Sequence, residues 1–288
     1  MKEVVVLSGK GGTGKTSVVG AFAALAKRKV LSDCDVDAAD LHLLLSPTPL
    51  EAHEFWSGQV AEIDVEKCTR CGLCEEACRF DAIHDFLVAR VDCEGCGLCA
   101  RICPAGAIRM KDSLAGHWFV SETRFGPLVH ATLGIAQENS GKLVHLVRQK
   151  AKETAKHAGI EVTINDGPPG IGCAVISSLS GASLACIVTE PSISGIRDME
   201  RVLSVCRHFS VPALVCVNKH DINEEGTRQI EQYCVGEGID VIAQIPFDTK
   251  VTEAQVQGVP IVEYTDDLRL IGPILGAWKA VSARLEAA

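Results

Sequence analysis

The chain has 288 residues, 47% of them hydrophobic, which is enough apolar material for one large core or for a core with a smaller satellite domain. Its net charge of −9 disfavours a general affinity for nucleic acid or for anionic lipid. It has no stretch of about 18 uncharged apolar residues and no signal-peptide pattern, which excludes a membrane-spanning helix and predicts a cytoplasmic protein.

The first predicted element is a buried parallel strand, formed by the β-branched run at residues 2–8. A glycine-rich loop follows, and then a helix over residues 16–29. A second short strand is predicted at residues 30–33, and a brief helical turn at residues 41–45, before two prolines.

The glycine-rich loop carries the pattern of a phosphate-binding site. Between a strand and a helix, G-x-x-x-x-G-K-[ST] is matched by Gly9, Lys10, Gly11, Gly12, Thr13, Gly14, Lys15 and Thr16. Glycines let successive backbone N–H groups turn towards phosphate oxygens, and the helix N-terminus adds its positive dipole end. We expect Lys15 to contact the β- and γ-phosphates, Thr16 to ligate Mg²⁺, and Ser17 to complete the nucleotide contacts.

Lys10, a second lysine early in this loop, resembles the deviant Walker A motif of the MinD/ParA/nitrogenase-iron-protein group. In that family this lysine reaches across a nucleotide-sandwich dimer to the partner's phosphates. The resemblance implies an ATP-dependent homodimer in which Lys10 acts with Lys15 in catalysis and stabilises transition-state charge. A solvated loop charge is the alternative interpretation of Lys10.

Acidic residues follow the second strand. By resemblance, Asp35 has the place of the family's switch I aspartate, which orients the attacking water. Asp33 and Asp37 could instead cap a helix or join the Mg²⁺ shell, and the sequence does not separate these roles.

The composition changes abruptly between about residues 63 and 110, where the sequence repeats itself. Four cysteines recur at an offset of 25 residues, from 68 to 93, and the following Ala-Ile pair recurs at the same offset. Each half reads C-x₂-C-x₂-C-x₃-C, the run of bacterial two-cluster ferredoxins, in which the fourth cysteine ligates the other cluster. The predicted [4Fe–4S] ligands are therefore Cys68, Cys71, Cys74 and Cys103 for one cluster, and Cys93, Cys96, Cys99 and Cys78 for the other.

Zinc is the alternative for these cysteines. Structural zinc sites generally use two C-x₂₋₄-C pairs separated by a longer loop, whereas three consecutive short steps suit a cubane better. The first half departs from the ferredoxin run at Arg79, where a proline usually follows the fourth cysteine.

The rest of the chain alternates strands and helices. Strands are predicted at residues 117–123, 127–133, 161–165, 184–189, 213–217 and 241–244, with a helix over 140–157 and helix starts near residues 172, 194 and 223. The predicted fold is a doubly wound, mostly parallel α/β P-loop domain, residues 1–60 and 113–288, with an inserted small α+β bacterial-ferredoxin-like domain at residues 61–112.

Three segments in this part resemble further family motifs. Asp166, after an apolar strand and before a Gly/Pro turn, resembles the Walker B and switch II segment and would hold Mg²⁺ through water; a plain strand-end turn is the alternative. Asn218 resembles the base-contacting asparagine of the group, and Pro246 and Asp248 its second base-side loop. Asn218 to Asp221 also spells N-K-x-D, which keeps GTP as an alternative to ATP.

Six cysteines lie outside the repeat, and we expect them to be mostly buried apolar filler: Cys34, Cys173, Cys186, Cys206, Cys216 and Cys234. Cys173 lies at an offset from Asp166 similar to that of the cluster-ligating cysteine of the nitrogenase iron protein. A buried structural cysteine is the expectation there, with a transient intersubunit cluster as the alternative.

The C-terminal segment has apolar residues at helical spacing between Leu268 and Leu285. MinD proteins end in a membrane-targeting amphipathic helix, but basic residues are few here and Pro273 is expected to interrupt the helix near its start. A core-packing helix is therefore predicted.

Together these motifs resemble the MinD-superfamily ATPases with an inserted ferredoxin domain, known from anaerobes. The resemblance implies slow, dimerisation-dependent hydrolysis of MgATP, coupled to two [4Fe–4S] clusters that pass electrons to a redox or metallocofactor partner. An ATP-dependent carrier or scaffold for iron–sulfur or metallocofactor assembly is one alternative. A redox-sensing positioning or cell-division ATPase is another, against which the net charge and the C-terminus both argue.

Overall fold

The computed structural model describes residues 1–134 and 140–287. Over this range the chain forms two compact units. The first contains Met1–Ala52, Phe119–Ala131 and the chain from Ser140 onward, and the second contains His53–Trp118 with a short stretch that begins at Thr132.

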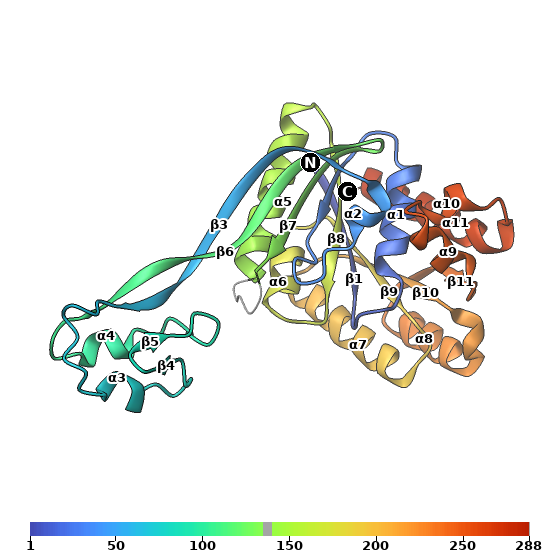
Figure 1. The fold of residues 1–288 in the computed structure, drawn as a ribbon. Coiled ribbons are helices and arrows are strands. Elements are labelled where there is room, and N and C mark those ends of the chain that lie inside the picture. The colour runs from blue at the N-terminus through green and yellow to red at the C-terminus, as the bar shows by residue number, and fades with distance from the viewer. Residues whose placement is uncertain (135–139, 288) are drawn as a thin grey trace. The chain divides into compact units, whose positions relative to one another are not determined.

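A nine-stranded sheet has the order β11-β10-β9-β1-β8-β2-β7-β6-β3 (Figure 1). β1 pairs in parallel with β8 and β9, β10 with β9 and β11, and β2 with β7 and β8. The strands are β1 (Lys2–Ser8), β2 (Val30–Asp33), β3 (Thr48–Ile63), β6 (Ile108–Thr123), β7 (Gly126–Leu133), β8 (Val162–Pro169), β9 (Leu184–Thr189), β10 (Ala213–Asn218) and β11 (Asp240–Ile245).

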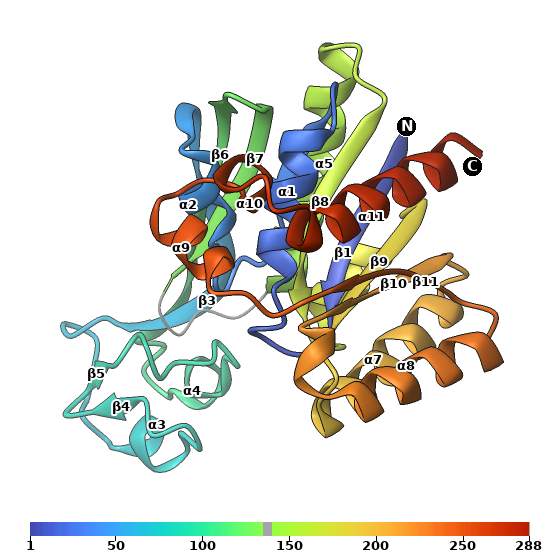
Figure 2. The ribbon, with the colours of Figure 1, turned by 90° about the vertical axis from the view of Figure 1, so that its right-hand side faces the viewer.

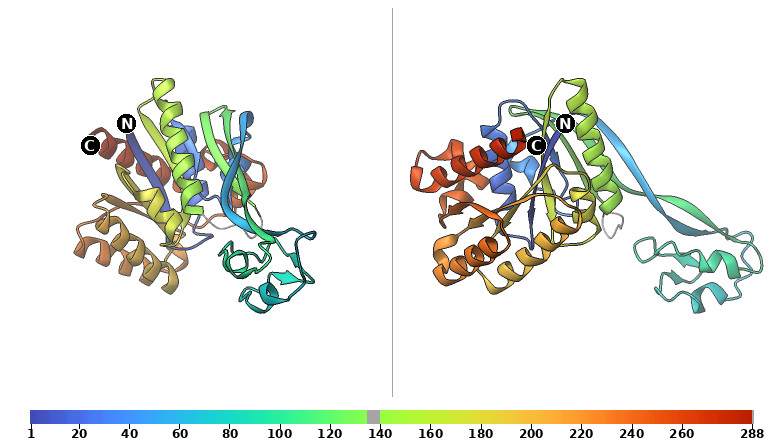
Figure 3. Two further views of the ribbon diagram at one scale, coloured as in Figure 1. Left: turned by 90° about the vertical axis from the view of Figure 1, so that its left-hand side faces the viewer. Right: turned by 180° about the vertical axis from the view of Figure 1, so that it is seen from behind.

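Helices cover both faces of the parallel part of the sheet (Figures 2 and 3). One face carries α1 (Lys15–Leu25), α2 (Leu41–Leu45), α9 (Lys250–Val256), α10 (Ile261–Tyr264) and α11 (Leu268–Ala287). The other carries α6 (Cys173–Leu179), α7 (Ile193–His208) and α8 (Glu224–Gly236), with α5 (Ser140–His157) packed against α6. The predicted doubly wound, mostly parallel α/β class is therefore confirmed.

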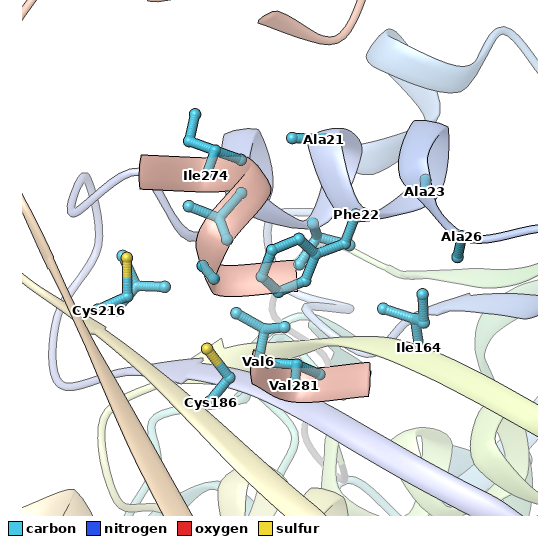
Figure 4. Close-up of a cluster of buried hydrophobic side chains, with 14 of the residues drawn as sticks. Val6, Ala21, Phe22, Ala23, Ala26, Ile164, Cys186, Cys216, Ile274 and Val281 are labelled. Carbon is cyan, nitrogen blue, oxygen red and sulfur yellow. The ribbon is translucent and has the colours of Figure 1, made fainter. Parts of the chain in front are cut away.

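Residues of β1 alternate between the two cores. Val4 and Val6 belong to the cluster under α1 and α11, whereas Val5 and Leu7 belong to the cluster under α7. Figure 4 shows Phe22 of α1 in the first cluster, above Val6. A strand buried on both faces reads as a continuous apolar run, as this one does. The loop that leaves β1 consequently lies at the carboxyl edge of the parallel strands, where ligands bind in such sheets.

Two helices differ from their predicted boundaries. α1 ends at Leu25 instead of residue 29, because the backbone becomes extended at Ala26, whose carbonyl accepts a hydrogen bond from Lys29 Nζ at 2.8 Å. α11 continues through Pro273, so the expected interruption is wrong. Its inner side is buried in the core, which confirms the core-packing prediction.

No helix in residues 1–134 and 140–287 is both long enough and apolar enough to cross a membrane.

β3 was not predicted at all, and the strand predicted at residues 117–123 covers only the last seven residues of β6. These two neighbouring 16-residue strands form a ribbon whose chain leads into and out of the second unit (Figure 1). The first twelve residues of β3 are exposed except Phe55 and Ser57, so they lack the apolar pattern by which a strand is recognised. Pro49 also weighs against a strand unless the strand is at an edge, which β3 is.

The second unit keeps the internal repeat in its backbone. Helix α3 (Leu73–Glu76) begins after Gly72 and α4 (Leu98–Ile102) after Gly97, and both glycines are left-handed, with φ of 79° and 72°. A two-stranded sheet of β4 (Ile83–His84) and β5 (Leu87–Val88) completes the unit. Its small core includes Ile83 and Ile108, which stand after the equivalent alanines of the two halves. The assignment as a ferredoxin-like domain stays a prediction.

His130 of β7 is expected to make the fold acid-sensitive. Burial, with a contribution from His42, lowers its pKa from 6.5 to about 4, and Ser121 Oγ lies 2.9 Å from its Nε2. As the pH falls, His130 is therefore protonated in the unfolded chain before it is protonated in the folded one. The stability that its neutral form contributes is fully present above pH 6.5 and is lost as the pH falls towards 4. The free energy of unfolding of the wild type falls between pH 7 and pH 5. We expect this fall to be about 1–2 kcal/mol smaller in His130→Gln.

Urea unfolding at the two pH values checks this expectation. His157→Gln, the same substitution at an exposed position, is measured alongside as the control. Equal pH dependence in wild type and His130→Gln would contradict the role of His130.

Candidate functional sites

The loop between β1 and α1 has a backbone that requires glycine at particular positions. Gly12 and Gly14 have φ of 78° and 92°, in the left-handed region that other residues rarely adopt. A Cβ on Gly9 would lie only 2.3 Å from Asp198 Cβ of α7. These constraints hold the loop close to α7, in the glycine-rich conformation by which backbone N–H groups commonly face an anion.

This loop borders a cavity of about 440 Å³ in the first unit. Most of the predicted phosphate-site residues line it: Gly11, Gly12, Thr13, Gly14, Lys15, Thr16 and Ser17. The rest of the lining comes from Ser8, Asp35, Ala38, Asp40, Leu43, Leu44, Pro169 and Gln255. Gly9 and Lys10 are outside this lining.

Lys15 lies between two carboxylates. Its Nζ is 2.6 Å from Asp166 Oδ1 and 3.3 Å from Asp35 Oδ2. Burial alone would lower the pKa of Lys15, but the carboxylates of Asp166 and Asp35 outweigh burial and raise it. The lysine is therefore a fixed positive charge at the base of the cavity, where phosphate oxygens would meet it.

A magnesium ion suits the oxygen groups here. Asp166 is 1% exposed, and within the described residues its Oδ2 has no hydrogen-bond partner although it is buried. Such an atom needs a ligand or a bound water. Thr16 lines the cavity, whereas Asp166 is not among the described lining residues but contacts Lys15, which is. A hydroxyl and a carboxylate are therefore both present around Lys15, and Mg²⁺ prefers oxygen ligands of these kinds.

The three aspartates after β2 have different surroundings. Asp33 is fully buried and accepts hydrogen bonds from the backbone N–H groups of Asp35 and Leu41, each at 3.1 Å. Burial and the nearby Asp166 carboxylate raise the pKa of Asp33 well above its ordinary value. Asp33 thus shapes the loop, Asp37 is exposed, and Asp35 is the one of the three that lines the cavity.

The predicted base-side residues are not in the cavity lining. Asn218 donates from Nδ2 to the carbonyl of Thr13 at 2.7 Å, so it supports the phosphate loop. Asp248 accepts hydrogen bonds from the Arg269 guanidinium at 2.8 Å and from the Lys250 N–H at 3.0 Å. Like Asn218, Pro246 and Asp248 are missing from the described residues that line the cavity, and their nucleotide roles stay predictions.

Gln255 of α9 also lines the cavity and was not predicted from the sequence. Its Nε2 donates to Ser17 Oγ at 2.8 Å across 238 positions of the chain. A lone glutamine in a short helix carries no local signal of such a role, and only the tertiary fold brings α9 to this site.

The eight cysteines of the repeat line two separate cavities in the second unit. One is lined by Cys68, Cys71, Cys74 and Cys103, together with Ile63, Phe86 and Ile108. The other is lined by Cys78, Cys93, Cys96 and Cys99, together with Ala61, Phe80 and Met110. Each cavity thus combines three cysteines of one half with the fourth cysteine of the other half. These are the two groups into which the ferredoxin run divides the cysteines.

The surroundings of these thiols suit iron–sulfur clusters. The backbone N–H groups of Ala82, Ala107 and Ala61 donate to the sulfurs of Cys78, Cys103 and Cys93 at 3.4, 3.3 and 3.5 Å. N–H···S hydrogen bonds and an apolar lining are features that tune cluster potentials.

The spacing of the thiols bears on the kind of metal. In residues 1–134 and 140–287, no three or more His, Cys, Asp or Glu side chains are grouped so as to hold a single metal ion. Each cavity nevertheless presents four thiols, which is the number of ligands that one [4Fe–4S] cluster takes.

Most cysteines outside the repeat behave as predicted. Cys34, Cys186, Cys206, Cys216 and Cys234 are buried. Cys173 is exposed, at the first residue of α6, so the expectation of a buried cysteine is wrong there. The reason is that α6 turns its Ala174 and Val175 into the core and leaves its first residue at the surface.

The sequence matches one protein family over most of its length and has relatives in two archaea. The CobQ/CobB/MinD/ParA nucleotide binding domain family matches residues 4–261. An uncharacterised protein of Methanocaldococcus jannaschii is 32% identical over 252 residues, which cover 86% of each chain. An iron–sulfur cluster carrier protein of Pyrococcus abyssi is 26% identical over 283 residues, covering 92% of this chain and 80% of that protein.

Comparisons with solved structures concern the fold. The cell division ATPase MinD of Pyrococcus furiosus superposes with a TM-score of 0.61 at 19% identity, over 98% of both chains. The septum site-determining protein MinD of Pyrococcus horikoshii, complexed with Mg-ADP, gives a TM-score of 0.60 at 19% identity, over 97% of this chain and 95% of that chain. At this identity the likeness shows a shared fold.

Proposed function

This chain belongs to the CobQ/CobB/MinD/ParA nucleotide-binding family, and on that premise we propose that it hydrolyses MgATP as a homodimer and carries two [4Fe–4S] clusters in its second unit. Its output is nucleotide-gated electron transfer to a redox or metallocofactor protein. The observation that carries the proposal is the division of the eight repeat cysteines between two cavities, in a chain whose first unit has a complete phosphate loop.

The residues of the first unit have separate tasks in hydrolysis. Lys15 binds the β- and γ-phosphates, and Thr16 and Asp166 hold Mg²⁺ directly or through water. Asp35 orients the attacking water, since it lines the cavity beside Lys15. Lys10 crosses to the partner's phosphates in the dimer and stabilises the charge that develops during transfer. ATP is the proposed nucleotide, and competition between ATP and GTP tests the N-K-x-D alternative.

In the second unit, the four cysteines of each cavity would hold one cluster by their thiolates. Two [4Fe–4S] clusters supply single-electron transfer when bound. Cys71 and Cys96, the second cysteines of the two runs, are exposed, whereas the other six are less so. An electron-transfer partner would therefore approach the second unit at these two positions.

Chain connectivity gives a route from nucleotide to clusters. Leu43 and Leu44 of α2 line the nucleotide cavity, and α2 leads directly into β3, whose far end precedes Cys68. The junction contains Pro47 and Pro49, which stiffen it because proline fixes φ. A nucleotide-dependent shift of α2 is therefore passed on to the ribbon.

A second candidate function is ATP-dependent transfer of an iron–sulfur cluster or metallocofactor to another protein. It is favoured by the relative from Pyrococcus abyssi, which is named an iron–sulfur cluster carrier protein and covers 92% of this chain. Electron transfer would leave the clusters in place through each cycle, whereas a carrier would lose them to its acceptor.

The deciding experiment is purification without oxygen, followed by iron and sulfide analysis and by spectroscopy with and without MgATP. We expect about eight iron atoms per chain, reversible reduction, and a cluster spectrum or potential that changes with MgATP. Loss of iron to an apo-acceptor on addition of ATP would favour the carrier. Protein that arrives colourless and without iron would refute the clusters altogether.

A further inference from the structure

Lys10 is held by its own chain. Its Nζ lies 2.7 Å from Glu190 Oε1, 3.1 Å from Ser192 Oγ and 3.0 Å from Ser194 Oγ. Ser192 is the N-cap residue of α7, and its hydroxyl also accepts a hydrogen bond from the Gly195 N–H. The ammonium group therefore sits beside the N-terminus of a 16-residue helix. The positive end of the helix dipole disfavours a cation there.

Glu190 offsets this unfavourable position. It follows the last residue of β9, and its side chain is 13% exposed, so its attraction for a cation is less screened than that of a surface carboxylate. Its other oxygen, Oε2, lies 3.0 Å from Lys219 Nζ. Burial would raise the pKa of Glu190, but its hydrogen bonds with Lys10 and Lys219 lower it, so the carboxylate is charged at neutral pH.

We propose that Glu190 is a positioning residue that holds Lys10 on its own subunit in the monomer and so sets how readily the dimer forms. The inference rests on the proposed function, in which Lys10 reaches the partner's phosphates. To do so, its ammonium group must leave Glu190, Ser192 and Ser194. Breaking this contact opposes association, and bound triphosphate on the partner replaces the lost carboxylate.

A different role of Glu190 must be separated from this one. Lys219 Nζ also donates to the carbonyl of Gly12 at 3.0 Å, so Glu190 could act by keeping Lys219 on the phosphate loop. In that case its loss would weaken nucleotide binding by the monomer. If Glu190 acts through Lys10, its loss changes the association of subunits that are already saturated with nucleotide.

The test compares wild type with Glu190→Gln, both purified without oxygen and saturated with the magnesium complex of adenylyl imidodiphosphate. Sedimentation gives the dimer dissociation constant, which we expect to fall about three- to fivefold in the variant, the effect of one moderately exposed ion pair. In turnover assays with ATP, the protein concentration for half-maximal rate should fall by the same factor, while KM for ATP stays within about twofold.

Two further variants make the result specific. Glu237→Gln removes a carboxylate that pairs with Arg207 elsewhere in the first unit, and it should leave the dissociation constant unchanged. Lys10→Ala combined with Glu190→Gln should dimerise no better than Lys10→Ala alone. Rescue of dimerisation in the double variant, or an unchanged constant in Glu190→Gln, would overturn the inference. A wild type that stays monomeric with nucleotide would instead refute the proposed dimer.

Discussion

Replacing Lys15 with alanine is expected to lower the affinity for MgATP by at least about a hundredfold. Hydrogen bonds to charged groups contribute about 1.5–3 kcal/mol each, and this ammonium would make them to both the β- and γ-phosphates. In the wild type, Lys15 Nζ lies 2.6 Å from Asp166 and 3.3 Å from Asp35. The substitution would leave both carboxylates facing the incoming phosphates without a counter-charge. Repulsion between carboxylates and phosphates then adds to the lost attraction.

The measurement is calorimetric or fluorescent titration with MgATP and MgADP. Removing one partner of a buried ion pair can also destabilise the fold, by about 3–5 kcal/mol. A thermal melt must therefore accompany the titration, and Lys15→Gln offers a second variant that keeps hydrogen-bond donors at this place. Because the pKa of Asp33 is already raised, uptake of a proton there relieves part of the repulsion among the three carboxylates.

Lys10→Ala is the matched control in the same loop. Its ammonium group is outside the cavity lining and is bound to Glu190, so nucleotide binding by the monomer should stay within a few fold of the wild type. Dimerisation and turnover should fall, turnover by about a hundredfold or more if Lys10 acts as a finger on the partner's phosphates. Retained turnover in Lys10→Ala would remove the cross-subunit role, whatever Lys15→Ala shows.

The second large effect is expected from Cys78→Ala. Cys78 belongs by sequence to the first cysteine run, yet it lines the cavity of the second run with Cys93, Cys96 and Cys99. We therefore expect Cys78→Ala and Cys96→Ala to lose the same cluster and about half of the iron. Cys103→Ala should resemble Cys71→Ala instead, with loss of the other cluster.

Iron and sulfide analysis with electron paramagnetic resonance of the reduced protein distinguishes the two pairs. ATP affinity should be nearly unchanged in all four variants, because the cysteines and the nucleotide cavity belong to different units. The exposed Cys173 is the control, and Cys173→Ala should keep all of its iron. Loss of iron in that variant would point to the intersubunit cluster. Equal spectra for Cys78→Ala and Cys71→Ala would contradict the crossed ligand sets.

Some elements follow from short stretches of sequence. Residues 2–8 form a strand because they contain a run of β-branched valines, and the glycine-rich loop with Lys15 follows it as the phosphate-loop pattern predicts. β9 and α5 have the predicted bounds of residues 184–189 and 140–157, since their patterns are long and uninterrupted. The 25-residue repeat likewise reappears as two equivalent helix starts at Gly72 and Gly97.

Other elements escape any local pattern. Much of β3 is exposed, so it lacks both an apolar run and a regular alternation of apolar and polar residues. The burial of Cys173 was predicted wrongly, because whether a helix start is covered depends on elements distant in sequence.

The sequence by itself determined which chemical groups this protein has: a phosphate loop with two lysines, and two cysteine runs of ferredoxin spacing. Only the tertiary structure decided which groups meet. The contacts of Lys15 with Asp166, Lys10 with Glu190 and Ser17 with Gln255 each join distant parts of the chain. Local sequence fixes the conformation of a few neighbouring residues, whereas such contacts depend on strand order and helix packing, to which the whole core contributes.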